Sequence, residues 1–222
     1  MSASTPPDGP DLAAGLSIKS DPGAARADDV RQLTGNLTIG SRLFASGVAF
    51  LFISFLFAFF YLRAVNSNGL WRPKGVEPVQ IWGIAVLLFM ILSAVAFDYA
   101  RRVLVGAAEP QWRTWSIVAL VCGILVVVFQ GIDYAAITFK TDQGGWASVF
   151  WGWTVVQLLF WLGAVYWMET LVAQTIRRPP ASPREGTAGT DLLRPSADAA
   201  IVYLYTMVTV AVISYVLLYI IK

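Results

Sequence analysis

Residues 43–62 read LFASGVAFLFISFLFAFFYL, which is 20 residues without a charge between Arg42 and Arg63. A helix that crosses the hydrocarbon core of a bilayer needs roughly 20 apolar residues. Apolar side chains would occupy all faces of a helix over this stretch, whereas a helix on the surface of a soluble protein carries them on one stripe. The stretch is therefore predicted to be a transmembrane helix.

Four more stretches between consecutive charged residues have the same length and character. They hold between 19 and 26 uncharged residues each, so each can form a helix that satisfies its own backbone hydrogen bonds in lipid. The sequence thus predicts an all-α polytopic membrane protein with five transmembrane helices. The predicted spans are about 42–63, 79–100, 114–137, 146–172 and 199–221.

Composition supports a membrane protein and argues against a nucleic-acid partner. Hydrophobic residues make up 57% of the chain and charged residues 14%, and the mean hydropathy is +0.63. A soluble domain carries about 25% charged residues. The net charge of +2 is too small to favour a polyanion, and the basic residues lie in loops that flank the apolar stretches.

The distribution of basic residues predicts the orientation. The amino-terminal tail, the second loop and the fourth loop together carry 11 of the 16 basic residues, and the other loops and the carboxyl terminus carry 5. Because basic residues are in excess in cytoplasmic loops, we expect the amino terminus in the cytoplasm and the carboxyl terminus outside. Residues 1–38 are predicted to be a disordered cytoplasmic tail, 39–222 the membrane domain, and 178–197 a proline-rich cytoplasmic loop.

The residues that catalysis or metal binding would need are scarce. The chain has no histidine and a single cysteine, Cys122, in an uncharged stretch. Histidine is the commonest metal ligand and the side chain best suited to proton transfer near neutral pH. Sequence motifs for phosphate binding, zinc hydrolysis or nucleophilic catalysis do not occur. We therefore predict no catalytic, cofactor-binding or metal-binding residue in this chain.

A few polar side chains fall within the predicted spans. Asp98, Asp133 and Glu169 each lie toward one end of a span, where contact with water and headgroups would explain them. Gln130 and Gln157 lie deeper, and the expected role of such amides is hydrogen bonding between helices.

Short motifs along the chain resemble those of subunit III of the haem-copper terminal oxidases (cytochrome c oxidase), in its five-helix bacterial form. The resemblance covers residues from about 42 to the end. It rests on FAFFYLR at 57–63, GLWRP at 69–73, Leu92-Ser93, and FQGIDY at 129–134, which is similar to a Gln-x-x-Glu-Tyr pattern of that family.

Three polar motifs of that family are not retained. A Ser-Glu pair of the first helix is Ser46-Gly47 here, and a Thr-Gly-x-His-x-x-His run is replaced by TVVQLLF at 154–160. In the final helix, YLYTMV at 203–208 keeps only the tyrosine of a Tyr-Trp-His-Phe-Val-Asp motif. These losses affect the proton-uptake role of the family more than its packing role.

The resemblance implies a subunit without a redox centre, located in a bacterial inner membrane. Haem and copper are then expected in partner subunits, and the expected partners are the catalytic subunit, other respiratory subunits and phospholipid. The residues expected to make structural, lipid or subunit contacts are Arg63, Trp71, Gln130, Asp133, Tyr134, Gln157 and Glu169.

Several alternatives remain open from the sequence. A subunit III homologue that serves nitric oxide reductase would have the same features. A small transporter or permease subunit would need a polar site near the bilayer midplane, which the apolar interiors of the first, second and fifth spans disfavour. An assembly factor that leaves the mature complex is also compatible with the pattern.

Overall fold

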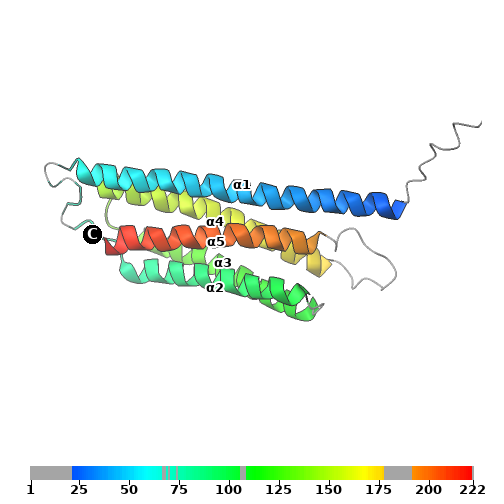
Figure 1. The fold of residues 1–222 in the computed structure, drawn as a ribbon. Helices are drawn as coiled ribbons and strands as arrows, with labels where there is room; N and C mark the ends of the chain where they lie inside the picture. The colour runs from blue at the N-terminus through cyan, green and yellow to red at the C-terminus, as the bar shows by residue number, and fades with distance from the viewer. Residues whose placement is uncertain are drawn as a thin grey trace, which may run out of the picture.

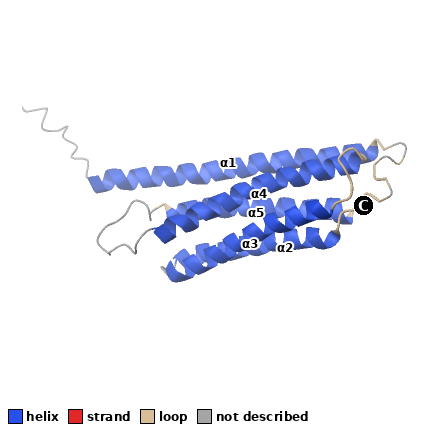
Figure 2. Cartoon of the chain, turned by 180° about the vertical axis from the view of Figure 1, so that it is seen from behind, coloured by secondary structure: helices blue, strands red, loops and turns tan. Residues whose placement is uncertain are grey.

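Five long helices lie side by side in an elongated bundle, in a computed structural model that describes residues 22–66, 69, 71–73, 75–105, 109–177 and 192–221 (Figure 1). No strand occurs in these ranges (Figure 2). The helices are α1 (Pro22–Ala64), α2 (Gln80–Val105), α3 (Glu109–Ala136), α4 (Gly145–Arg177) and α5 (Leu193–Tyr215). A π-helical turn, η1 (Val216–Ile220), directly continues α5.

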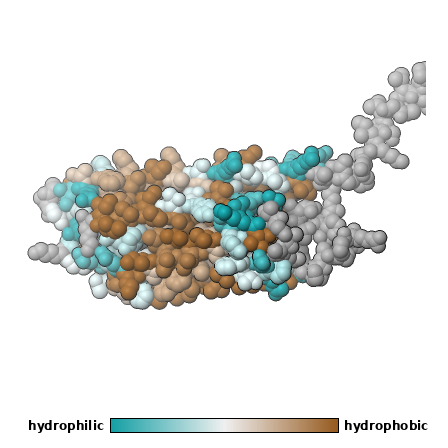
Figure 3. Space-filling model, turned by 60° about the horizontal axis from the view of Figure 1, so that its bottom comes forward, coloured by the Kyte–Doolittle hydropathy of each residue, from teal (hydrophilic) through white to brown (hydrophobic). Residues whose placement is uncertain are grey.

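The five predicted spans are confirmed as helices. Each of the five helices has the length and apolar composition to cross a membrane. Figure 3 shows apolar side chains over the middle of one face of the bundle and hydrophilic side chains toward both of its ends. This band fits a hydrocarbon layer between two polar surfaces.

We call the two ends of the bundle the carboxyl end and the amino end, after the ends of the chain that lie nearest to them. The carboxyl end holds η1 and the α1–α2 and α3–α4 connections, and the amino end holds the start of α5 and the ends of α2 and α4. α5 packs against α1, α2 and α4, while α2 and α3 form an extensive antiparallel pair. α5 is therefore the most enclosed helix, and α1 lies at the edge.

Two helices begin earlier than the sequence predicted. α1 begins at Pro22, within the segment 1–38 that was predicted to be a disordered tail, and it runs past the other helices at the amino end (Figure 1). Leu33 and Leu37 lie one turn apart there and line a shallow groove with Trp167 of α4. α5 begins at Leu193, inside the predicted loop 178–197. Residues 1–21 and 178–191 lie outside the described ranges.

Hydrogen bonds from side chains to carbonyl groups connect helices through the apolar core. Nε1 of Trp161 donates to the carbonyl of Gly123 at 3.0 Å, and the hydroxyl of Tyr203 donates to the carbonyl of Phe160 at 2.6 Å. Ser93 Oγ donates to the carbonyl of Ala119 at 2.8 Å. Packing and such bonds hold membrane helices together because lipid provides little hydrophobic driving force between them.

Candidate functional site

The most polar part of the bundle interior surrounds Asp133, near the carboxyl end of α3. Its side chain is fully buried, and Oδ2 accepts a hydrogen bond of 2.9 Å from the Tyr219 hydroxyl and one of 3.3 Å from Nε2 of Gln130. Oδ1 has no hydrogen-bond partner in the described part of the chain. The expectation that Asp133 contacts water at the membrane surface is wrong, because Tyr219 of η1 packs against the carboxyl group and the side chain is fully buried, although it lies close to the helix end.

The π-helical turn η1 brings Tyr219 to this carboxyl group. The Ile221 N–H donates to the carbonyl of Val216 at 2.8 Å, a spacing of five residues rather than four. The wider turn changes the helical phase, so that Leu217, Leu218 and Tyr219 are all buried in succession. Such π turns are uncommon and are frequent at functional sites.

Gly83 on α2 makes room for the Tyr219 ring. A Cβ atom added at Gly83 would lie 2.5 Å from Cε1 of Tyr219, which is far inside van der Waals contact. α2 and η1 can therefore approach this closely only with glycine at this position, and the ring is held between α2 and the Asp133 carboxyl group.

Two buried glutamines belong to the same region. Gln130 and Gln157 are both 7% exposed, and with Gly83, Thr154, Ser214 and Tyr219 they line a small pocket among α2, α3, α4 and α5. Nε2 of Gln157 contacts Sδ of Met90 at 3.8 Å, and its Oε1 has no partner in the described ranges. We call this space the Gln130–Gln157 pocket.

The other predicted contact residues, Arg63, Trp71, Tyr134 and Glu169, do not line this pocket. The Tyr134 ring follows Asp133 in sequence and packs on Trp151 of α4, with ring centroids 5.1 Å apart. Arg63 is exposed in the last turn of α1, and Glu169 is exposed on α4. Trp71 is buried in the α1–α2 connection.

Trp71 organises the carboxyl end of the bundle. The backbone N–H of Trp71 donates to Oδ1 of Asn66 at 3.0 Å. Its backbone carbonyl accepts a hydrogen bond of 2.9 Å from the backbone N–H of Trp146, the second residue of α4. The Phe59 ring meets its indole edge to face, with centroids 5.1 Å apart. The guanidinium carbon of Arg72 lies 4.8 Å from the centroid of the Trp146 ring. The α1–α2 connection is thereby attached to the first turn of α4.

An ion-pair cluster joins α2 to α5 at the amino end. The buried carboxylate of Asp98 binds Arg101 at 2.8 Å and Arg102 at 2.6 Å. Arg101 also binds Asp198 of α5 at 2.7 Å. Asp98 was expected to be solvated at the interface, but its carboxylate is instead neutralised by two arginines of its own helix, which explains a buried charge at this depth.

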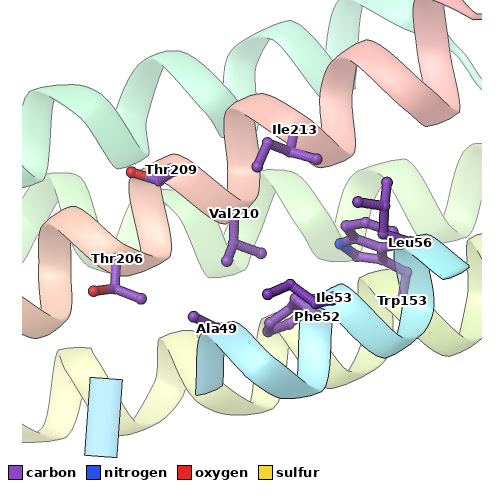
Figure 4. A pocket seen from close by; sticks show the side chains of 9 residues that line it. All are labelled: Ala49, Phe52, Ile53, Leu56, Trp153, Thr206, Thr209, Val210 and Ile213. Carbon is purple, nitrogen blue, oxygen red and sulfur yellow. The ribbon is translucent and has the colours of Figure 1, made fainter. Parts of the chain in front are cut away.

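An apolar groove runs between α1 and α5. It has a volume of about 330 Å³, with Phe52, Ile53 and Leu56 on the α1 side and Thr206, Thr209 and Val210 on the α5 side, and Trp153 of α4 also lines it (Figure 4). The hydroxyls of Thr206 and Thr209 donate to carbonyl groups of their own helix, at 2.9 Å each. The groove therefore offers an almost entirely apolar surface.

Clusters of typical metal-ligating side chains are absent from the described residues. These residues contain no group of three or more histidine, cysteine, aspartate or glutamate side chains that could hold a metal ion, and the whole chain has no histidine. Nitrogen and sulfur ligands are what haem iron and copper need. The donors on this chain therefore do not fit the haem and copper of an oxidase.

Three residues of these sites were not predicted from the sequence. The position of Tyr219 facing Asp133 depends on a π turn that helical periodicity does not reveal. Nothing in the sequence around Gly83 indicates the close approach of the Tyr219 ring. Asp198 could have been paired with Arg101, since both lie at the same predicted membrane surface.

Comparison with known proteins places the chain in a family. Residues 22–177 match the family model described as cytochrome c oxidase subunit III. Similar proteins named cytochrome c oxidase subunit 3 come from Arabidopsis thaliana (31% identical over 120 residues, 51% of this chain and 45% of the relative), Marchantia polymorpha (30%, 120 residues, 51% and 45%) and Pyricularia grisea (26%, 133 residues, 58% and 49%).

The chain spans about half the length of the curated relatives that it matches. The family match nevertheless covers most of the chain, from the start of α1 to the end of α4. The resemblance inferred from FAFFYLR, GLWRP and FQGIDY is thus confirmed. This multi-pass membrane chain belongs to the cytochrome c oxidase subunit III family.

Proposed function

We propose that this chain is a non-catalytic accessory subunit of a respiratory haem-copper oxidase, which stabilises the catalytic subunit and orders lipid beside it. The match of residues 22–177 to the subunit III family carries the proposal. The lack of histidine supports it, because histidine is the usual ligand of haem iron and copper and this chain has none to offer. The chain lies in a bacterial inner membrane with its amino terminus in the cytoplasm, as its basic residues suggest.

The outer face of α1 supports a role in contact with lipid or another subunit. Large apolar residues are exposed along it over several turns, among them Leu43, Phe50, Phe57 and Phe60. α1 is also the least buried of the five helices over its most apolar part. Contacts of Arg63 and Glu169 with partner subunits are part of the same proposal, since both side chains are exposed near opposite ends of the bundle.

The groove between α1 and α5 supports the lipid-ordering part of the proposal. A volume of about 330 Å³ is at the lower end of the range for ligand sites, roughly 300–1,000 Å³, and the apolar lining suits an acyl chain. In a bilayer this groove would hold part of a phospholipid and keep it against three helices.

Ala49→Trp tests lipid ordering, because Ala49 lines the groove and an indole would fill it. Ser46→Trp is the matched control, since Ser46 is exposed on α1 one turn away and does not line the groove. Native mass spectrometry of the purified protein should show fewer retained phospholipids in Ala49→Trp than in Ser46→Trp. Equal retention in both variants would argue against a lipid in the groove.

Deletion of the chain tests the stabilising role. In a strain without it, the haem-bearing subunit should assemble with its normal haem spectrum but lose activity faster during turnover or at raised temperature. An assembly factor would instead be needed for haem insertion, so that the spectrum itself would change. A transporter or permease subunit would leave both the spectrum and the lifetime of the oxidase unchanged.

A further inference from the structure

The Gln130–Gln157 pocket combines buried polar groups with unfilled space. It is lined by two amides, by the hydroxyl-bearing residues Thr154 and Ser214, and by Tyr219. Four helices contribute to it, which distinguishes it from the apolar surfaces elsewhere in the bundle interior. An unpaired polar group in such a place costs about 1–3 kcal/mol.

The hydrogen-bonding capacity of the Gln157 side-chain amide is not fully used. Its amide N–H contacts only a thioether sulfur, that of Met90 at 3.8 Å, and Oε1 has no partner in the described ranges. Sulfur is a weak acceptor. The nearby Thr154 hydroxyl donates to the carbonyl of Phe150 at 2.8 Å, one turn back in its own helix, so it does not serve Gln157.

The size of the pocket matches a single water molecule. Its volume is about 20 Å³, and a polar space of roughly 10–15 Å³ with two to four polar partners holds one ordered water. An empty space is expected only where the lining is apolar.

We propose that the Gln130–Gln157 pocket is a water-binding site. The bound water donates a hydrogen bond to Oε1 of Gln157 and links this amide to the polar groups around Tyr219 and Asp133. Oε1 of Gln157 then has a hydrogen-bond partner. The water also connects α4 to the contact between α3 and η1. This proposal is independent of the partner subunits and of the lipid groove.

X-ray radiolytic labelling of the purified protein tests the proposal, because hydroxyl radicals formed from a bound water oxidise nearby side chains. Met90 and Met168 are a matched pair: they are 1% and 0% exposed, and each sulfur lies 3.8 Å from one polar side chain. Met90 contacts Gln157, which lines the pocket, whereas Met168 contacts Ser93, which does not. Peptide mass spectrometry should find Met90 oxidised several-fold faster than Met168.

Gln157→Leu removes the amide and leaves an apolar side chain that is one atom shorter. In this variant the oxidation rate of Met90 should fall to that of Met168, and the rate of Met168 should stay the same. Equal rates for the two methionines in the unmodified protein, or a Met90 rate that Gln157→Leu does not change, would overturn the proposal.

A density map of the unmodified protein at a resolution that shows waters provides a second test, which needs no variant to fold. It should contain a peak within hydrogen-bond distance of Oε1 of Gln157. A pocket closed by side-chain carbon atoms would overturn the proposal.

Discussion

The hydroxyl of Tyr219 donates a 2.9 Å hydrogen bond to Oδ2 of Asp133, and so joins the end of the chain to the end of α3. Both residues are buried, at 5% and 0% exposure. The Asp133 carboxyl group is also one of the few ionisable groups in the interior of the bundle that the structure describes. Removal of this hydrogen bond should therefore weaken the packing of η1 against α3 and lower the free energy of unfolding.

Tyr219→Phe should lower the free energy of unfolding by about 1–2 kcal/mol. An average interhelical hydrogen bond in a membrane protein contributes about 0.6 kcal/mol, but loss of this one leaves a buried carboxyl group with one bond, to Gln130. Thermal unfolding in detergent measures the change. Tyr166→Phe, at an exposed position of α4, is the control and should have little effect. Equal stability of the two variants would show that the Tyr219 hydroxyl contributes nothing.

Gly83→Ala should destabilise the protein by about 1–3 kcal/mol, as overpacking of a close contact does. The added methyl group would collide with the Tyr219 ring at 2.5 Å. Gly47→Ala on α1 is the matched control, because a Cβ there meets nothing within 4 Å, and alanine in a helix is more favourable than glycine by up to about 1 kcal/mol. The two substitutions should thus change the unfolding temperature in opposite directions.

The ion-pair cluster at the amino end predicts unequal effects for two aspartates. Asp98→Asn should cost about 1–3 kcal/mol, since the buried carboxylate accepts hydrogen bonds from both Arg101 and Arg102. Asp198→Asn should cost at most about 1 kcal/mol, because the Asp198 side chain is 44% exposed and its ion pair with Arg101 is partly solvated. Denaturation of both variants in the same detergent checks the order. A larger effect at Asp198 would mean that the link between α2 and α5 outweighs neutralisation of Asp98.

Trp161→Phe should destabilise the bundle by about 1–2 kcal/mol, because it removes the 3.0 Å hydrogen bond to the carbonyl of Gly123 and leaves a space beside α3. Trp115→Phe offers a comparison at an exposed position, where the indole is 40% exposed. The expected order of unfolding temperatures is Trp115→Phe above Trp161→Phe. The reverse order would contradict the role assigned to the α3–α4 hydrogen bond.

The helices could be predicted from the sequence because the distance between charges is a direct measure of what can cross a bilayer. The stretch from Arg42 to Arg63 and its four counterparts all became helices. Helix ends were less predictable: the segment from Pro22 has no long apolar run, yet α1 includes it and places Leu33 and Leu37 beside Trp167.

The candidate site could be predicted only in part. Gln130 and Asp133 were found because polar residues in an apolar span are rare, and they do lie together. The partner of Asp133 could not be found, since Tyr219 reaches it from 86 residues away through a change of helical phase in η1. Neither a π turn nor the close approach at Gly83 follows from apolar periodicity.

Residence of the chain in a haem-copper oxidase can be measured by its stoichiometry with haem. The tagged chain is purified from its own membranes after mild detergent extraction, and the haem content per copy is determined from the absorption spectrum. A resident subunit should keep one haem-bearing partner at a fixed ratio through successive purification steps. A chain that purifies without haem, or with a haem content that declines at each step while the oxidase remains active elsewhere, would contradict residence in the oxidase.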